Sequence, residues 1–120
     1  MTVTVYHYPN CSTCRGARKW LEGRGVDAKL VDLVATPPSE KKLKALWKAS
    51  GLPLKKLFNT SGQSYKSGGF KDRLPAMSEA EQLAALAADG KLIKRPIVDL
   101  GDGRVLVGFR EAEYAAQLEP

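Results

Sequence analysis

The sequence predicts an α/β fold built on a mixed sheet of four strands. Three observations carry this prediction: a strand, helix and strand pattern over residues 2–34, helical patterns through the middle of the chain, and a hairpin pattern at residues 94–107. A strand, helix and strand unit gives a parallel pair with a right-handed crossover, whereas a hairpin gives an antiparallel pair. The chain has 120 residues, and we expect residues 1–120 to form a single domain.

The first part of the chain begins with a predicted strand at residues 2–6, where β-branched and aromatic residues predominate. A helix fits residues 12–21, with Asn10 placed to cap its start and Gly23 placed to end it. Residues 28–34 are mostly apolar and predict the second strand. These elements account for the parallel pair.

The middle of the chain is predicted to be largely helical. Residues 39–50 place apolar side chains at the spacing of one helix face, and residues 52–58 fit a shorter helix. Residues 59–69 are polar and rich in glycine, which predicts a loop. A capping box opens a further helix at residues 78–89, and Gly90 is expected to end it.

The last part of the chain is predicted to be a hairpin followed by a helix. Residues 94–98 fit a strand with a proline at its entrance, and residues 101–103 (Gly-Asp-Gly) fit a turn. Residues 104–107 then return as the partner strand, and residues 111–118 fit a final helix. The hairpin supplies the antiparallel half of the sheet.

Composition and charge exclude several classes of protein. Apolar residues make up 43% and charged residues 27%, which is ordinary for a globular domain. No apolar stretch is long enough to span a membrane and the N-terminus does not resemble a secretory signal, so we expect a cytoplasmic protein with no membrane partner. The formal net charge is +6, with the basic excess in residues 1–60. This excess would suit an anionic substrate or an acidic partner, but a solvated helix face is the simpler explanation, and no nucleic-acid motif accompanies it.

Cys11 and Cys14 form a C-x-x-C pattern where the first strand meets the first helix. A thiol in the first turn of a helix lies near unpaired N–H groups and the positive end of the helix dipole, and both favour the thiolate. We therefore expect Cys11 to be the reactive sulfur. Cys14 shares the apolar helix face with Ala17 and Leu21 and is expected to be its buried partner. Two unreactive cysteines are the alternative, and a metal site is not expected because His7 is the one further soft ligand.

Three other side chains are candidates to act on the thiolate or on a substrate. His7 precedes Cys11 by four residues and could support the thiolate electrostatically, although a histidine at a strand end is often only a surface residue. Arg95 precedes Pro96, where a cis peptide is common, and arginine can hold an oxyanion with two hydrogen bonds. Arg15 falls near the helix start, where it could bind an oxyanion or simply be solvated.

Four segments resemble the arsenate reductase (ArsC) and Spx family of thioredoxin-like proteins. These segments are residues 6–15, 37–39, 59–65 and 93–97, and they match in order along nearly the whole chain. The resemblance implies a thioredoxin-like fold in which a βαβ unit is followed by a ββα unit. It also implies a helical insertion between them, at about residues 39–90.

The resemblance also implies roles for individual residues. In the glutathione-linked and glutaredoxin-linked arsenate reductases of the family, the cysteine matching Cys11 attacks arsenate and the histidine matching His7 supports its low pKa. Three arginines hold the oxyanion there. Arg95 matches one of them, while the other two positions fall on Asn59 and near Arg110. Because losing charge-assisted hydrogen bonds weakens oxyanion binding by about 1.5–3 kcal/mol each, we expect arsenate to be reduced inefficiently.

The sequence therefore predicts a thiol-disulfide oxidoreductase similar to the arsenate reductases. Its nucleophile would be Cys11 and its resolving thiol Cys14, and its substrate a small oxyanion or a thiol or disulfide compound. No bound cofactor is expected, and glutathione or glutaredoxin would supply electrons. The alternative that the family also offers is an Spx-like redox-sensing regulator that binds the α subunit of RNA polymerase.

Overall fold

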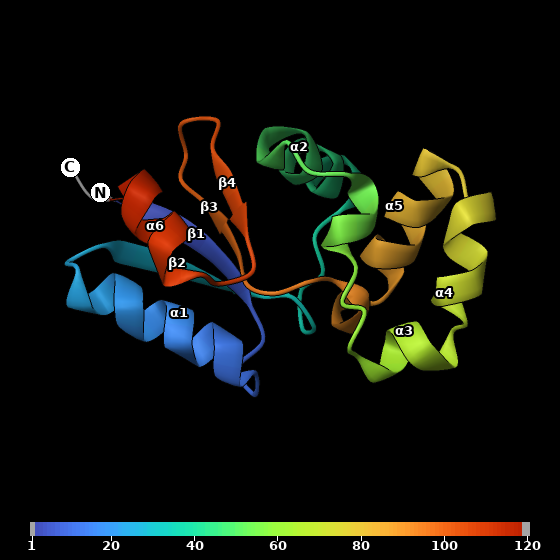
Figure 1. Cartoon of the computed structure of the whole chain (residues 1–120), viewed down its shortest axis with the longest axis horizontal. Helices are drawn as coiled ribbons and strands as arrows, with labels where there is room; N and C mark the ends of the chain where they lie inside the picture. The colour runs from blue at the N-terminus through green and yellow to red at the C-terminus, as the bar shows by residue number, and fades with distance from the viewer. Residues whose placement is uncertain (1, 119–120) are drawn as a thin grey trace.

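The computed structural model describes residues 2–118, which form a four-stranded sheet with helices on both faces (Figure 1). The strand order is β2-β1-β3-β4. Strand β1 (Thr2–His7) pairs in parallel with β2 (Asp27–Asp32) and antiparallel with β3 (Ile97–Asp99), which pairs antiparallel with β4 (Val105–Val107). The predicted mixed sheet of four strands is therefore confirmed.

One face of the sheet is covered by α1 (Ser12–Gly23) and α6 (Glu111–Leu118). A helical region between β2 and β3, which we call the insertion, covers part of the other face and extends the molecule to 42 Å along its longest axis. No helix among residues 2–118 has the length and apolar character needed to cross a membrane. The elements of the insertion are α2 (Glu40–Ser50), η1 (Leu54–Leu57), α3 (Gln63–Ser67), α4 (Phe70–Arg73), η2 (Leu74–Ala76), α5 (Glu79–Ala88) and η3 (Gly90–Leu92).

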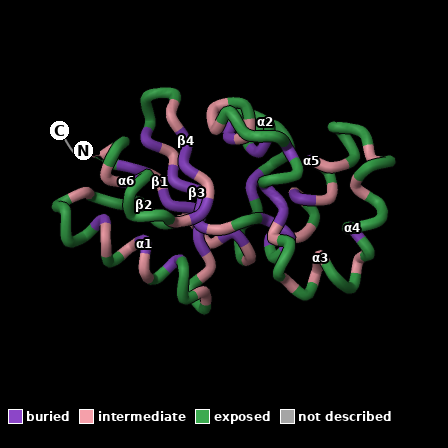
Figure 2. Tube along the Cα trace, viewed as in Figure 1, coloured by how far each residue is buried: buried purple, intermediate pink, exposed green. Residues whose placement is uncertain are grey.

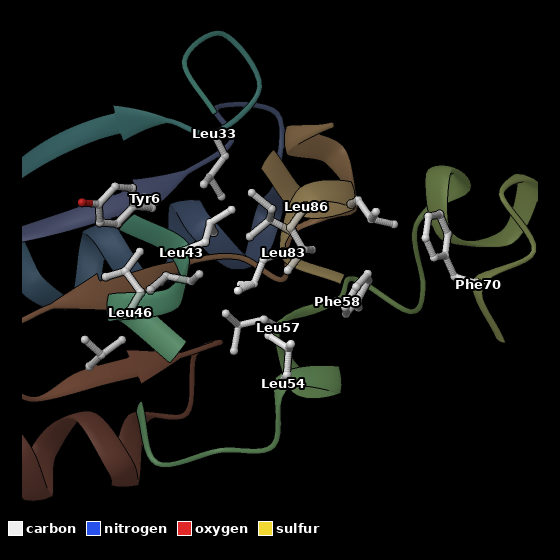
Figure 3. Close-up of a cluster of buried hydrophobic side chains, with 14 residues drawn as sticks. Tyr6, Leu33, Leu43, Leu46, Leu54, Leu57, Phe58, Phe70, Leu83 and Leu86 are labelled. Atoms are coloured by element: carbon white, nitrogen blue, oxygen red, sulfur yellow. The ribbon is translucent and has the colours of Figure 1, made fainter. Parts of the chain in front are cut away.

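Two apolar cores lie on opposite faces of the sheet, because successive side chains of a strand point to opposite faces. Val5 and Val98 face α1 and α6, where they pack with Leu21 and Tyr114. Tyr6 and its neighbours face the insertion (Figure 3). Buried residues accordingly follow the strands and the junction with the insertion (Figure 2). The core that faces the insertion includes Tyr6, Leu33, Leu43, Leu46, Leu57, Phe58, Leu83, Leu86 and Ile97.

Two predictions about the insertion are wrong in part. The short helix predicted at residues 52–58 is a single 3-10 turn, Leu54–Leu57. The loop predicted at residues 59–69 contains the helix α3, which follows the extended residue Gly62. The hydroxyl of Ser67 donates a hydrogen bond of 2.6 Å to the carbonyl of Gln63 within this helix. Polar composition suggested a loop, but Tyr65 within this segment packs against the core, which favours one helical turn.

Gly90 does not end α5 in the way predicted. Asp89 is the C-terminal cap of α5, and Gly90 begins the 3-10 turn η3. The glycine is needed for space, because a Cβ atom at this position would overlap the backbone carbonyl of Leu33. The end of the insertion thus lies directly against the chain that leaves β2.

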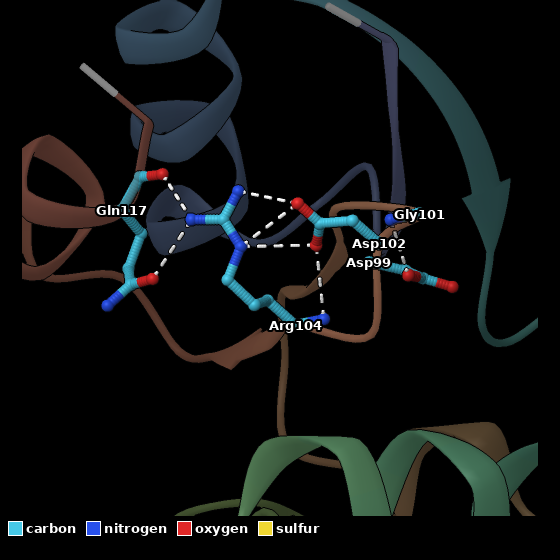
Figure 4. Close-up of polar contacts among 5 residues, drawn as sticks. All are labelled: Asp99, Gly101, Asp102, Arg104 and Gln117. Carbon is cyan, nitrogen blue, oxygen red and sulfur yellow. Dashed lines mark hydrogen bonds and ion pairs between the residues drawn. The ribbon is translucent and has the colours of Figure 1, made fainter. Parts of the chain in front are cut away.

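The hairpin between β3 and β4 is tied to α6 by a polar network (Figure 4). The carboxylate of Asp99 accepts a hydrogen bond of 2.9 Å from the N–H of Gly101, whose φ of 82° suits glycine. The guanidinium of Arg104 pairs with Asp102 at 2.7 Å and donates to the carbonyl of Gln117 at 2.7 Å. This network holds the C-terminal helix against the turn.

Candidate functional site

Cys11 is the residue that caps helix α1. Its backbone is extended, and its Sγ accepts a hydrogen bond of 3.4 Å from the N–H of Cys14. The N–H of Cys11 donates to the carbonyl of Tyr8 at 3.0 Å, which closes the turn after β1. The prediction that Asn10 is the cap is wrong, because the sulfur one residue later already accepts from the first turn of the helix. The cap and the candidate nucleophile are therefore the same atom.

The two thiols differ in acidity. Burial raises the pKa of Cys11, but hydrogen bonds from the backbone N–H and the thiol of Cys14, and from Arg95, outweigh burial and leave this pKa below its usual value. Cys14 has no exposed surface, and burial raises its pKa to about 12, against a hydrogen bond from the N–H of Tyr8. Near neutral pH, Cys11 is the thiol that ionises more readily, and Cys14 is a protonated donor to it.

Arg95 lies beside Cys11 and precedes a cis peptide bond to Pro96. Its guanidinium carbon lies 4.8 Å from the ring centre of Tyr8. One guanidinium nitrogen, Nη1, is buried and has no hydrogen-bond partner among the described residues. The site therefore holds an unsatisfied cationic donor next to the candidate nucleophile.

His7 is buried at the end of β1. Burial and the nearby charge of Arg18 lower its pKa, while Asp32 acts in the opposite direction. Its Nδ1 atom is buried without a hydrogen-bond partner among the described residues. A histidine with a lowered pKa is neutral near pH 7, so the cation that lowers the pKa of Cys11 is Arg95.

Cys11 opens into a cavity of about 320 Å³ where three parts of the chain meet. These parts are the start of α1, the segment between η1 and α3, and the segments on either side of the β3–β4 hairpin. Phe58 and Ile93 form an antiparallel bridge, and the N–H of Asn59 donates to the carbonyl of Leu92 at 2.8 Å, which fixes the insertion beside the cavity. The cavity is lined by Cys11, Thr13, Asn59, Ser61, Gly62, Lys94, Arg95, Gly108 and Phe109.

The structure brings together some of the predicted oxyanion-binding residues. Arg95 and Asn59 line the cavity of Cys11. Arg15 and Arg110 do not. The exposed side chain of Arg15 donates to the carbonyl of Pro9 at 3.1 Å, which turns it back onto the preceding loop. Arg110 lines two neighbouring cavities instead, while the preceding residue, Phe109, lines the Cys11 cavity.

Several residues of the cavity were not predicted from the sequence. Lys94 could have been predicted from the sequence, because it forms a basic pair with Arg95 directly before Pro96. A Cβ at Gly62 would lie 2.6 Å from Nδ2 of Asn59, so this glycine leaves room for the Asn59 side chain in its present position. Thr13 and Ser61 contribute small polar surfaces that no sequence pattern distinguished.

A C-x-x-C pair at the start of the helix that follows β1, in a βαβ unit, is typical of thioredoxin-like proteins. The comparisons with known proteins agree. The model of the ArsC family matches residues 6–117, and the chain therefore belongs to the ArsC family. A crystal structure of a putative ArsC family related protein from Bacteroides fragilis is similar over 97% of both chains, with 44% identity and a TM-score of 0.91. The predicted α/β thioredoxin-like fold is confirmed.

The relatives of this chain carry different descriptions. The uncharacterized protein YusI of Bacillus subtilis (strain 168) is 50% identical over 95% of this chain and 96% of its own. An arsenate reductase of Rhizobium meliloti (strain 1021) is 34% identical over 82% of this chain and 69% of its own. The regulatory protein MgsR of Bacillus subtilis (strain 168) is 24% identical over 92% of this chain and 86% of its own. The chain is thus an arsenate-reductase-like member of its family.

Proposed function

We propose that the protein is a thiol-disulfide oxidoreductase in which Cys11 attacks the substrate and Cys14 resolves the product. The observation that carries this proposal is the sulfur of Cys11, which caps α1 and lies beside Arg95 at a cavity. In the first step the Cys11 thiolate attacks one sulfur of a disulfide substrate. A new bond joins Cys11 to that sulfur, the substrate's own bond breaks, and the other half leaves as a thiolate that takes a proton from solvent.

The second step belongs to Cys14. Its thiolate attacks Sγ of Cys11, the bound half of the substrate leaves as a thiol, and an internal disulfide forms, so that two electrons pass from the protein to the substrate. The high pKa of Cys14 is caused first by burial, and the neighbouring Cys11 raises it further. That further contribution disappears once Cys11 is a neutral mixed disulfide. Cys14 is therefore more acidic at the stage when it must attack.

Small oxyanions are a second class of substrate for the same nucleophile. Arg95 offers an unsatisfied donor in the cavity, and Asn59 offers an uncharged amide. With Arg110 and Arg15 outside this cavity, one guanidinium serves an oxyanion, and arsenate is reduced inefficiently. Glutathione or glutaredoxin restores the dithiol in a reducing compartment such as the cytoplasm.

Mass spectrometry of the oxidised protein tests this proposal. The reduced protein is treated with diamide, with and without glutathione, and the products are mapped. We expect a loss of two hydrogens that joins Cys11 to Cys14 under both conditions, and a glutathione adduct on Cys11 only in C14S. Stable glutathione on Cys11 beside a free Cys14 in the wild type would contradict the resolving role and indicate a cycle with external thiols alone.

A redox-sensing regulator that binds the α subunit of RNA polymerase is the second candidate. The similarity to the regulatory protein MgsR favours it. The two candidates separate in a paired experiment: turnover of arsenate or a small disulfide coupled to NADPH through glutathione and glutaredoxin, beside capture of purified α subunit. Turnover without capture supports the oxidoreductase, and capture without turnover supports the regulator.

A further inference from the structure

The cavity of Cys11 is one of three neighbouring cavities that share lining residues. It shares Lys94 with a second cavity of about 310 Å³, which shares Lys55, Lys56 and Thr60 with a third of about 460 Å³. The three cavities lead from the start of α1 across the segment between η1 and α3 to the region between η1 and α5. We call them together the basic groove.

Every charged residue that lines the basic groove is a cation. The four lysines and Arg110 are exposed, and Arg95 is half-buried. Within residues 2–118, none of the six forms an ion pair, whereas Lys42, Lys44 and Arg104 elsewhere do. Beyond Arg110 the next cavity contains Glu113, so the run of unopposed positive charge ends there. The six cations are Lys55, Lys56, Lys71, Lys94, Arg95 and Arg110.

In the two cavities away from Cys11, the floor of the basic groove includes apolar side chains. Leu54 and Phe58 are buried residues of the core whose surfaces line it, and Leu74 is half-buried. Leu52 is 39% exposed and is one of two large apolar side chains with such exposure among the described residues. A row of cations over an apolar floor matches a ligand that has both carboxylates and apolar side chains.

Backbone hydrogen bonds join the cation-bearing segment of the insertion to the segment before β3. The N–H of Lys94 donates to the carbonyl of Leu57 at 2.7 Å, next to the bridge between Phe58 and Ile93. Lys55 and Lys56 of η1 and the Lys94-Arg95 pair before β3 are therefore joined through paired backbone. The backbone that carries these four cations is therefore preformed, while their long side chains remain adjustable.

An extended polypeptide fits these features better than a small molecule or a nucleic acid. A small oxyanion fills one cavity and leaves the cations of the other two unopposed. A nucleic acid would satisfy the cations, but it brings no apolar side chains to the floor and no sulfur to Cys11. A polypeptide brings carboxylates, apolar side chains and a cysteine on one chain.

We propose that the basic groove binds an extended acidic segment of a protein substrate and delivers a cysteine disulfide of that protein to Cys11. This inference rests on the proposed function and names the class of its substrate. Cys11 bonds to the substrate cysteine and expels the other sulfur, and Cys14 then releases the substrate cysteine as a thiol and leaves the protein oxidised. Acidic and apolar residues near that cysteine supply recognition.

Binding is tested with a pair of short fluorescent peptides, one with Asp, Glu and Leu around a central serine and one with Asn and Gln in place of the acids. The double variant K55E/K56E is compared with K19E/K41E, which changes the net charge equally at exposed lysines outside the groove. Circular dichroism verifies that both variants fold. At low salt we expect the acidic peptide to bind the wild type about tenfold more tightly than the neutral peptide does. The affinity for the acidic peptide should fall about tenfold in K55E/K56E and less than about twofold in K19E/K41E.

Three results would overturn the proposal: equal binding of the two peptides, equal losses in the two double variants, or tighter binding of a uridine oligonucleotide than of the acidic peptide. Reaction is followed separately, with a cysteine in place of the serine as its mixed disulfide with glutathione, and with hydroxyethyl disulfide as a small substrate. If the small disulfide is reduced and the acidic peptide has no advantage over the neutral one, the groove is not a substrate-binding site, while the proposed oxidoreductase activity stands. If the acidic peptide binds but neither disulfide is reduced, the proposed oxidoreductase activity is wrong, and the groove is a binding surface alone.

Discussion

The sheet half of the molecule and the insertion contribute differently to the site. The sheet half, which comprises the four strands with α1 and α6, positions Cys11 and Cys14 through a helix cap and Arg95 through the segment before β3. The insertion contributes Asn59 through a backbone bridge and exposed lysines such as Lys56 through a single 3-10 turn. In the proposed function, chemistry thus depends on backbone geometry, whereas recognition depends on long side chains that can change without disturbing the nucleophile.

The two parts nevertheless share the central strands of the sheet. Tyr6 and Ile97 belong to the core shared with the insertion, while Val5 and Val98, their neighbours on the same strands, belong to the core beneath α1 and α6. Each central strand is therefore packed on both faces. Loss of either core should affect the other through the sheet.

The largest expected effect is the loss of disulfide turnover in a variant that still binds the acidic peptide. Replacing Cys11 by serine should reduce disulfide turnover to the uncatalysed rate, because the nucleophile is lost, while serine still caps α1. Binding of the acidic peptide should remain within about twofold, because the cations that bind it are unchanged. Turnover is measured with hydroxyethyl disulfide and binding by fluorescence anisotropy. Residual turnover in C11S would place the nucleophile elsewhere.

The next effect tests whether the two cores unfold together. Leu86 lies in the core next to the insertion and Leu21 in the core beneath α1, and neither has exposed surface. L86A and L21A should each lower the free energy of unfolding by about 2–5 kcal/mol. Urea unfolding is followed by fluorescence in W47F, where Trp20 reports on α1, and in W20F, where Trp47 reports on α2. Different midpoints for the two reporters would show that the halves unfold separately.

Gly90 gives a smaller and more local effect at the junction of the two halves. G90A forces a Cβ atom against the carbonyl of Leu33 and should lower the free energy of unfolding by about 1–3 kcal/mol. Gly23 is the matched control, since it ends α1 with open space around it, and G23A should stabilise the protein by up to about 1 kcal/mol. Thermal unfolding compares the two variants. If G90A is as stable as the wild type, the backbone of the insertion can move away from Leu33 at little cost.

The smallest effect concerns the acidity of Cys11. Only the thiolate reacts with iodoacetamide, and Arg95 lowers the pKa of Cys11. R95M removes this cation, so the pKa should rise, the labelling curve should move to higher pH, and labelling below the midpoint should slow severalfold. R15M is the control, because Arg15 is exposed and donates to Pro9 instead. An unchanged curve in R95M would leave the helix terminus as the main cause of the low pKa.

Local patterns in the sequence were enough to predict the sheet, the capping box of α5 and the burial of Cys14. Alternation, helical spacing and cap residues are properties of neighbouring positions, so one sequence reveals them. The neutral state of His7 and the position of Arg110 depend on packing between distant segments. The need for Gly90 arises from its contact with the chain after β2, which no local pattern encodes.

The cap formed by Cys11 also bears on the oxidising strength of the protein. In the reduced state the sulfur of Cys11 accepts from the N–H of Cys14 at the positive end of α1, and a thiolate there is stabilised by both. A disulfide sulfur carries no charge, so the oxidised state loses this stabilisation. Any feature that favours the dithiol raises the reduction potential of the couple. The helix cap therefore makes the disulfide proposed between Cys11 and Cys14 easier for a cellular thiol to reduce, which readies the protein for its next turnover.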